Sequence, residues 1–151
     1  WQLALALLSS LAERHLRPNA ISYNAAISAC QKGRQWQLAV ALLDGMADLR
    51  VEPNVITFSA AISACEKGEQ WQAALALLGS MDGRRVAHDV TSCSAAVSAC
   101  EKGRRWEAAS GLLQEARRLD LRADVFSYGG AISAHGSGGC WARAVALLQD
   151  M

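Results

Sequence analysis

The sequence predicts an all-α fold, an α-solenoid of stacked helix-turn-helix hairpins with a 35-residue repeat. Five tryptophans, each 35 residues after the previous one, mark the period: Trp1, Trp36, Trp71, Trp106 and Trp141. The segment AISACQKGRQW, residues 26–36, returns as AISACEKGEQW at residues 61–71. Alanine and leucine, both strong helix formers, supply most of a hydrophobic fraction of 52%, and only two prolines occur in 151 residues. A fixed period in this range is typical of proteins whose units bury their apolar faces against neighbouring units.

Residues 1–16 are expected to form the second helix of a hairpin whose first helix would precede them. Their apolar side chains recur every three or four positions, which lines one helical face: Trp1, Ala4, Leu5, Leu7, Leu8 and Leu11. Pro18 disfavours helix in the residue before it, and Asn19 is well suited to cap the helix that follows. Because the sequence starts and ends inside a repeat, we expect it to belong to a longer array.

Each following unit begins with a helix that has two usable faces, the first of them from Ala20 to about Lys32. One face follows the i, i+3, i+4, i+7 rule and should be buried. Its members in the four units are Tyr23, Ala26, Ile27, Cys30; Phe58, Ala61, Ile62, Cys65; Cys93, Ala96, Val97, Cys100; and Tyr128, Ala131, Ile132, His135. The other face is more polar: Ile21, Asn24, Ser28, Gln31, Lys32; Ile56, Ser59, Ser63, Glu66, Lys67; Thr91, Ser94, Ser98, Glu101, Lys102; and Phe126, Gly129, Ser133, Ser137.

A turn, which we assign to Gly33, then leads into a second helix from about residue 35 to 47. Its apolar residues pack back onto the first helix: Trp36, Ala39, Val40, Leu42, Leu43 and Met46. Corresponding helices are expected at residues 71–81, at 106–119 and in the partial repeat that contains Trp141, giving four first helices and five second helices, nine in all. The array divides into a partial repeat at 1–19, full repeats at 20–54, 55–89 and 90–124, and a partial repeat at 125–151. Uncovered end helices should expose Trp1, Leu7, Leu147 and Leu148, through which the chain could self-associate.

Several classes of function are disfavoured. No apolar run reaches the roughly 18 residues of a membrane span. Five cysteines without a CxxC pair do not indicate a disulfide framework or a zinc site, and three of them repeat one packing position. The three histidines occur in no HExxH or HxE arrangement, and neither a GxSxG motif nor a phosphate-cradling loop is present. We therefore predict no enzyme activity, no cofactor and no metal.

Two segments that join successive repeats share one pattern: Val51-Glu52-Pro53-Asn54-Val55-Ile56-Thr57-Phe58-Ser59 and Arg17-Pro18-Asn19-Ala20-Ile21-Ser22-Tyr23-Asn24. This pattern resembles the linker of the pentatricopeptide repeat family. The tetratricopeptide repeat fits less well, because its tryptophan lies in the first helix and its period is about 34. His88 and Ala123 depart from the pattern, since they replace the linker proline. The resemblance implies a right-handed α-solenoid that binds single-stranded RNA with about one base per repeat.

The resemblance also implies roles for individual residues. Base-specifying pairs would be Asn24 with Asn54, Ser59 with Asp89, and Ser94 with Asp124. Base-stacking residues would be Ile21, Ile56, Thr91 and Phe126, and phosphate-binding residues would be Lys32, Lys67 and Lys102. Serine with a carboxylate suits guanine and asparagine suits a pyrimidine, so the predicted core is 5′-pyrimidine-G-G-3′. Repeat four, with Gly129, should add little specificity.

Each role has a simpler alternative. Asn19, Asn54, Asp89 and Asp124 could serve only as N-caps, the two serines could be small surface residues, and the three lysines could act only on helix dipoles. A net charge of +1, with Glu66 and Glu101 beside the lysines, predicts modest, salt-sensitive binding. The alternative function is a protein-protein interaction scaffold, or a spacer without a ligand. By resemblance, we expect a role in RNA processing, stability, editing or translation in a mitochondrion or plastid, with other RNA-processing proteins as partners.

Overall fold

The computed structural model describes residues 1–13, 18–118, 125–137 and 145. Eight helices and no strand occur in these residues, which confirms the all-α fold. They are α1 (Gln2–Glu13), α2 (Ala20–Lys32), α3 (Trp36–Asp48), α4 (Val55–Lys67), α5 (Trp71–Gly83), α6 (Val90–Lys102), α7 (Trp106–Arg118) and α8 (Val125–Ser137). The ninth expected helix falls outside the described residues.

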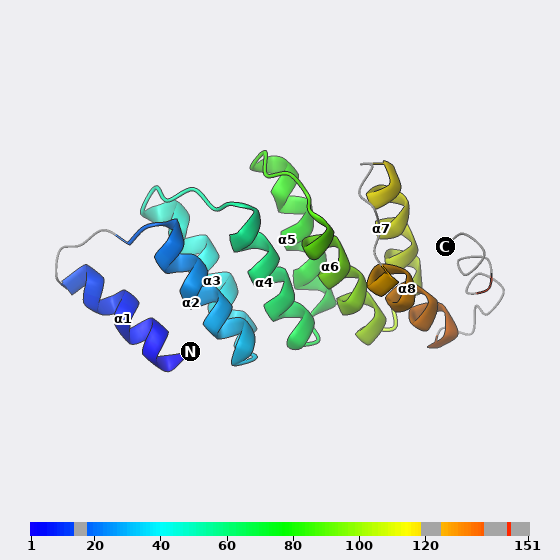
Figure 1. Cartoon of the computed structure of the whole chain (residues 1–151), viewed down its shortest axis with the longest axis horizontal. Helices are drawn as coiled ribbons and strands as arrows, with labels where there is room; N and C mark the ends of the chain where they lie inside the picture. The colour runs from blue at the N-terminus through cyan, green and yellow to red at the C-terminus, as the bar shows by residue number, and fades with distance from the viewer. Residues whose placement is uncertain (14–17, 119–124, 138–144, 146–151) are drawn as a thin grey trace.

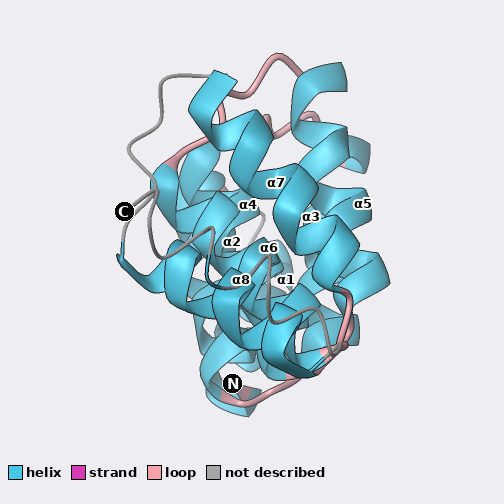
Figure 2. Cartoon of the chain, turned by 90° about the vertical axis from the view of Figure 1, so that its right-hand side faces the viewer, coloured by secondary structure: helices cyan, strands magenta, loops and turns pink. Residues whose placement is uncertain are grey.

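The helices form two layers. The first helices of the repeats, α2, α4, α6 and α8, lie in a row, each packed against the next (Figure 1). The second helices, α3, α5 and α7, form the layer beside them (Figure 2). Each second helix touches the first helix of its own repeat and that of the next repeat, so it ties two successive units together. One wall of the solenoid is therefore made of first helices alone.

The core consists of the apolar faces that the sequence predicts. All four expected residues are buried in each of α2, α4 and α6, and Ala39, Leu43 and Met46 of α3 are buried beneath them. In α8, Ala131 and His135 are buried. Removing one large apolar side chain from water contributes about 1.5–3 kcal/mol, so these faces supply most of what holds the stack together.

Polar side chains fix where the first helices begin. The side-chain oxygens of Asn19, Asn54 and Asp89 accept hydrogen bonds from the backbone N–H groups of the third helical residue in α2, α4 and α6. Each such N-cap contributes about 1 kcal/mol. The absence of a linker proline does not move the start of α6, where His88 Nε2 lies 2.8 Å from Asp82 Oδ1 across the linker. The cap expected at Asp124 lies outside the described residues.

The turn within each hairpin differs from the expectation for Gly33. This glycine has φ −82°, and the equivalent Gly68 has φ −85°, values open to any residue. The left-handed conformation occurs one position later, at Arg34 (φ 56°) and Glu69 (φ 58°). Glycine is required for a different reason: a Cβ on Gly68 would lie 2.5 Å from Cδ1 of Trp36, in the preceding repeat. The glycine therefore makes room for an indole.

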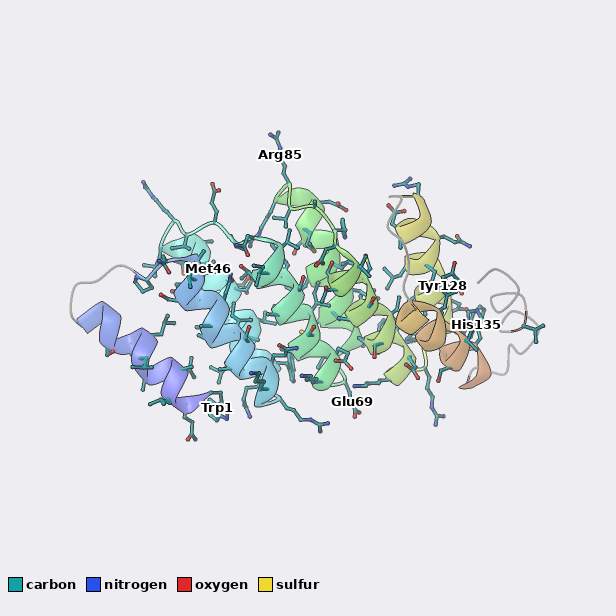
Figure 3. The ribbon with its side chains drawn as sticks, in the orientation of Figure 1. Trp1, Met46, Glu69, Arg85, Tyr128 and His135 are labelled. Carbon is teal, nitrogen blue, oxygen red and sulfur yellow. The ribbon has the colours of Figure 1, made fainter. Side chains whose placement is uncertain are left out.

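The expected apolar surface at the N-terminal end is present. Leu7 is 58% exposed and Trp1 is 40% exposed, beside the C-terminal end of α2 (Figure 3). Leu147 and Leu148 lie outside the described residues. No helix in the described part of the chain is long and apolar enough to cross a lipid bilayer.

Candidate nucleic-acid interface

The side chains expected to specify bases meet in pairs across adjacent repeats. Asn24 of α2 donates a hydrogen bond from Nδ2 to Oδ1 of Asn54, the cap of α4, over 3.4 Å. Ser59 of α4 donates from Oγ to Oδ1 of Asp89, the cap of α6, over 3.0 Å. Two of the three predicted pairs are thus brought together. Asp124, the predicted partner of Ser94 in the third pair, lies outside the described residues.

Ser59 is more enclosed than the sequence suggested. Only 8% of it is exposed, and its Oγ also lies 2.8 Å from the carbonyl oxygen of Val55, a second acceptor for the same proton. Asn24 is half-buried, and Asn54 is exposed. The hydroxyl of Ser59 is therefore directed at the helix backbone and at Asp89. In this second pair, the carboxylate of Asp89 is the more accessible partner.

Hydrogen bonds keep Asp89 ionised. Burial alone raises the pKa of its carboxyl group, but hydrogen bonds from the side chain and backbone of Ser92 and from Ser59 and Thr91 outweigh burial and lower that pKa. A carboxylate only accepts hydrogen bonds, whereas the amide of Asn54 both donates and accepts. The two caps consequently present different hydrogen-bonding patterns at equivalent places.

An exposed apolar position lies next to each pair. Ile21 is 76% exposed and Ile56 is 62% exposed, each at the second residue of its helix. Thr91 is exposed at the same position of α6. The side chain of Phe126, the fourth member, lies outside the described part of the structure. An isoleucine left in water at one position of successive repeats provides a flat apolar contact of the kind that base faces accept.

The three lysines occupy the other end of the row, as the last residues of α2, α4 and α6. This is the end at which Glu69 lies, opposite Arg85 (Figure 3). Lys102 Nζ lies 2.5 Å from Oε1 of Glu66 in the preceding repeat. Lys32 and Lys67 have no carboxylate within ion-pair distance among the described residues. The row of lysines is therefore present, with one of its members already engaged.

A cavity of about 680 Å³ opens between α4, α6 and α8. On the α8 side it is lined by Gly129 and Gly130, which stand where α6 carries Ser94 and Ala95. A Cβ on Gly129 would meet no atom within 4 Å. The base-specifying position of repeat four therefore presents no side chain to this wall.

The buried cysteines do not form a reactive or metal-binding site. Burial raises the pKa of Cys65 and Cys100 to about 11, so both thiols are protonated at neutral pH. Burial also raises the pKa of Cys30 and Cys93. In the described part of the chain, no three His, Cys, Asp or Glu side chains are grouped as metal ligands. The cysteines of the 35-residue grid are packing residues.

Two features of the interface were not predicted. Thr57 Oγ1 donates to Oδ1 of Asn24 over 2.6 Å and also completes a capping box with Asn54, and Ser92 completes the corresponding box with Asp89. The spacing of three residues between cap and hydroxyl is a recognisable signal for these boxes. The Glu66–Lys102 ion pair spans one repeat plus one residue, a spacing that becomes visible only when the two helices are placed side by side.

Comparisons with known proteins agree with this architecture. A sequence model of the PPR repeat family matches residues 18–67, and a model of the PPR repeat matches residues 56–86. A comparison with curated protein sequences gave no match. Among solved structures, the pentatricopeptide repeat protein PPR10 from maize is similar over 100% of this chain and 22% of its own, with 23% identity and a TM-score of 0.75.

Two structures that contain RNA are also similar. The PPR domain of Arabidopsis thaliana protein-only RNase P 1 in complex with tRNA aligns over 99% of this chain and 79% of its own, with 12% identity and a TM-score of 0.86. PPR10 in complex with an 18-nt psaJ RNA element aligns over 99% and 26%, with 25% identity and a TM-score of 0.73. The chain thus spans about a quarter of PPR10. Residues 18–86 are thus matched as PPR repeats, and the whole chain has the fold of the pentatricopeptide repeat structures.

Proposed function

We propose that the wall formed by α2, α4, α6 and α8 binds single-stranded RNA and selects about one base per repeat. The observation that carries the proposal is the pairing of Asn24 with Asn54 and of Ser59 with Asp89 across adjacent repeats. The pairs lie at a fixed interval beside exposed Ile21 and Ile56, an arrangement that can meet successive unstacked bases. The RNA-bound structures of PPR10 and of the RNase P domain support this choice of ligand. The chain would act as a binding module without catalysis of its own.

The chemistry of the pairs leads to the core 5′-pyrimidine-G-G-3′, with the RNA running parallel to the chain. Asn54 and Asn24 together offer donors and acceptors, which suits the mixed pairing edge of a pyrimidine. Asp89 is ionised and accepts only, which suits the adjacent N–H donors of guanine. By sequence, Ser94 and Asp124 repeat the second combination. Ile21, Ile56, Thr91 and Phe126 would pack on base faces without choosing among bases.

An exchange of specificity tests the proposal. In the variant Asn24→Ser with Asn54→Asp, repeat one carries the combination of repeat two, so the preferred core should become G-G-G. We expect a change in preference of at least about fivefold, since a good side-chain–base match contributes about 1–3 kcal/mol. Fluorescence anisotropy with oligomers that differ in one core base measures it. Asparagine and aspartate are equally good N-caps, so the fold should be retained.

The control for added charge is Asn19→Asp, a cap without a preceding first helix in this sequence. It should shift no base preference. Equal affinity of the unmodified protein for oligomers with and without the core would refute the specificity, and unchanged preference in the exchange variant would refute the residue assignment.

Lys32, Lys67 and Lys102 would line the path of the phosphates. Single strands release counterions on binding, so log K should fall with log salt by about 0.7 for each phosphate contact. Changing all three lysines to glutamate should abolish binding if they meet the backbone. Glu66 and Glu101 beside the row predict that affinity stays modest at physiological salt.

A protein-interaction scaffold is the second candidate, favoured by the cavity between α4, α6 and α8, which is lined in part by Glu66 and Glu101. A basic peptide segment would suit such a cavity. Unaltered RNA binding in the triple lysine-to-glutamate variant would favour this reading. We propose an organellar setting for either activity, in a mitochondrion or plastid, together with other RNA-processing proteins. Imaging of the tagged full-length protein would test the location.

A further inference from the structure

The Glu66–Lys102 contact makes one lysine of the row different from the other two. Glu66 Oε1 lies 2.5 Å from Lys102 Nζ and also accepts a hydrogen bond from Ser98 Oγ over 3.3 Å. The lysine ammonium lies 3.4 Å from the backbone carbonyl oxygen of Glu66 as well. The Glu66 side chain is only 17% exposed. These contacts hold the carboxylate in a partly buried place, so the pair is less screened than an ordinary surface ion pair.

The equivalent lysine one repeat earlier has no such partner. The residue that corresponds to Glu66 is Gln31, which carries no charge and leaves Lys67 without an ion pair among the described residues. One repeat later, the carboxylate of Glu101 has no hydrogen-bond or ion-pair partner within the described part of the chain. Among the described residues, Lys102 is therefore the lysine of the row that a carboxylate engages, whereas Lys32 and Lys67 are without an ion pair.

On the basis of the proposed RNA binding, we infer that Glu66 pairs with Lys102 in place of an RNA phosphate. Among the three lysines, Lys32 and Lys67 alone would then contact the RNA backbone. A carboxylate oxygen and a phosphate oxygen compete for the same ammonium donors. A phosphate that approached Lys102 would have to displace Glu66 and would meet the negative charge of Glu101. Glu66 is thus a residue that positions RNA by repulsion, setting where along the wall the backbone is held.

Single-site variants distinguish this arrangement from three equal lysines. Lys67→Gln should reduce the salt dependence of binding by about 0.7 in d log K/d log salt, the value of one lost phosphate contact. Lys102→Gln should leave it unchanged. Glu66→Gln keeps an acceptor for Ser98, releases Lys102, and should steepen the slope by about 0.7 and raise affinity up to about fivefold at low salt.

Glu69→Gln is the matched control, because it adds the same charge at an exposed turn residue at the same end of the hairpin. Its slope should equal that of the unmodified protein. In the Glu66→Gln background, Lys102→Gln should cancel the gain. Thermal unfolding followed by circular dichroism checks that every variant is folded.

Methylphosphonate substitution locates the contacts on the RNA. Each variant oligomer contains the core and has one phosphate replaced by a neutral methylphosphonate. Binding should weaken when the replaced phosphate is one that contacts Lys32 or Lys67, and should not change when it lies farther toward the 3′ end. In Glu66→Gln, one additional 3′ linkage should become sensitive. Equal slope losses for Lys67→Gln and Lys102→Gln, or identical behaviour of Glu66→Gln and Glu69→Gln, would overturn the inference while leaving RNA binding intact. Failure of the unmodified protein to bind any RNA would overturn the proposed function itself.

Discussion

Replacing Gly68 with alanine should destabilise the protein by about 1–3 kcal/mol, the usual cost of overpacking. The added Cβ would lie 2.5 Å from Cδ1 and 2.9 Å from Cγ of Trp36, whereas carbon atoms in contact prefer about 3.5–4.0 Å. Both atoms belong to the indole ring, so the whole ring must move. Backbone strain adds nothing, because φ at Gly68 is −85°. For a chain of this size, the melting temperature should fall by roughly 2–12 °C.

The control is Gly79→Ala, in the middle of α5, where a Cβ would meet nothing within 4 Å. That change should stabilise the helix by about 0.5–1 kcal/mol, since alanine is the better helix former. Urea unfolding measures both glycine variants. Adding Trp36→Leu alone and combined with Gly68→Ala completes a double-mutant cycle. If steric conflict with the indole is the cause, the cost of the alanine largely disappears in the Trp36→Leu background. An equal cost in both backgrounds would refute this explanation of the glycine.

Three further predictions concern stability. Glu69→Gly should stabilise the protein by up to about 1 kcal/mol in urea unfolding, because φ there is 58°, whereas Glu69→Gln should have no effect. Hydrogen bonds hold the pKa of Asp89 below its ordinary value of 3.8 despite burial. The ionised carboxylate therefore stabilises the fold above pH 3.8, and this contribution is lost as the pH falls through the lowered pKa. The stability difference between the unmodified protein and Asp89→Asn should therefore narrow in acid, and a constant difference down to about pH 2 would contradict the sign. His135 is 1% exposed and its Nε2 lies 2.9 Å from Ser110 Oγ, so Ser110→Val should cost about 1–3 kcal/mol. Adding His135→Cys should recover most of that loss. The positions equivalent to Ser110 and His135 hold an apolar residue and a cysteine, Leu75 and Cys100, one repeat earlier, and Val40 and Cys65 two repeats earlier.

The sequence was sufficient for the features that depend on period and local chemistry. Helical periodicity correctly predicted that Tyr23, Ile27 and Cys30 are buried, because one face of each first helix must be covered by neighbours. The caps at Asn54 and Asp89 follow from side chains that can reach the backbone N–H of the third helical residue. The pairing of Asn24 with Asn54 was implied by the family resemblance, and its role in reading bases stays a prediction.

Features that depend on close approach between helices were not predictable from the sequence. The hydroxyl of Ser59 could contact Val55, Asp89 or solvent, and the spacing of residues in the sequence does not determine which. Its burial was therefore not predictable. The reason for Gly68 lies in an indole 32 residues earlier in the chain. Likewise, Lys102 could bind Glu66 or remain in water, and only the separation of α4 and α6 decides between them.

The nesting of each indole against the next unit also provides a set of built-in optical probes. Trp1 lies at Gly33, Trp36 at Gly68 and Trp71 at Gly103, so each emission spectrum senses one junction between neighbours. Chains that keep a single one of these fluorophores would reveal whether heat opens the junctions together or peels them away from an end. Because every unit touches only its neighbours, sequential peeling is the behaviour that the physics of a linear stack favours once one junction is weakened.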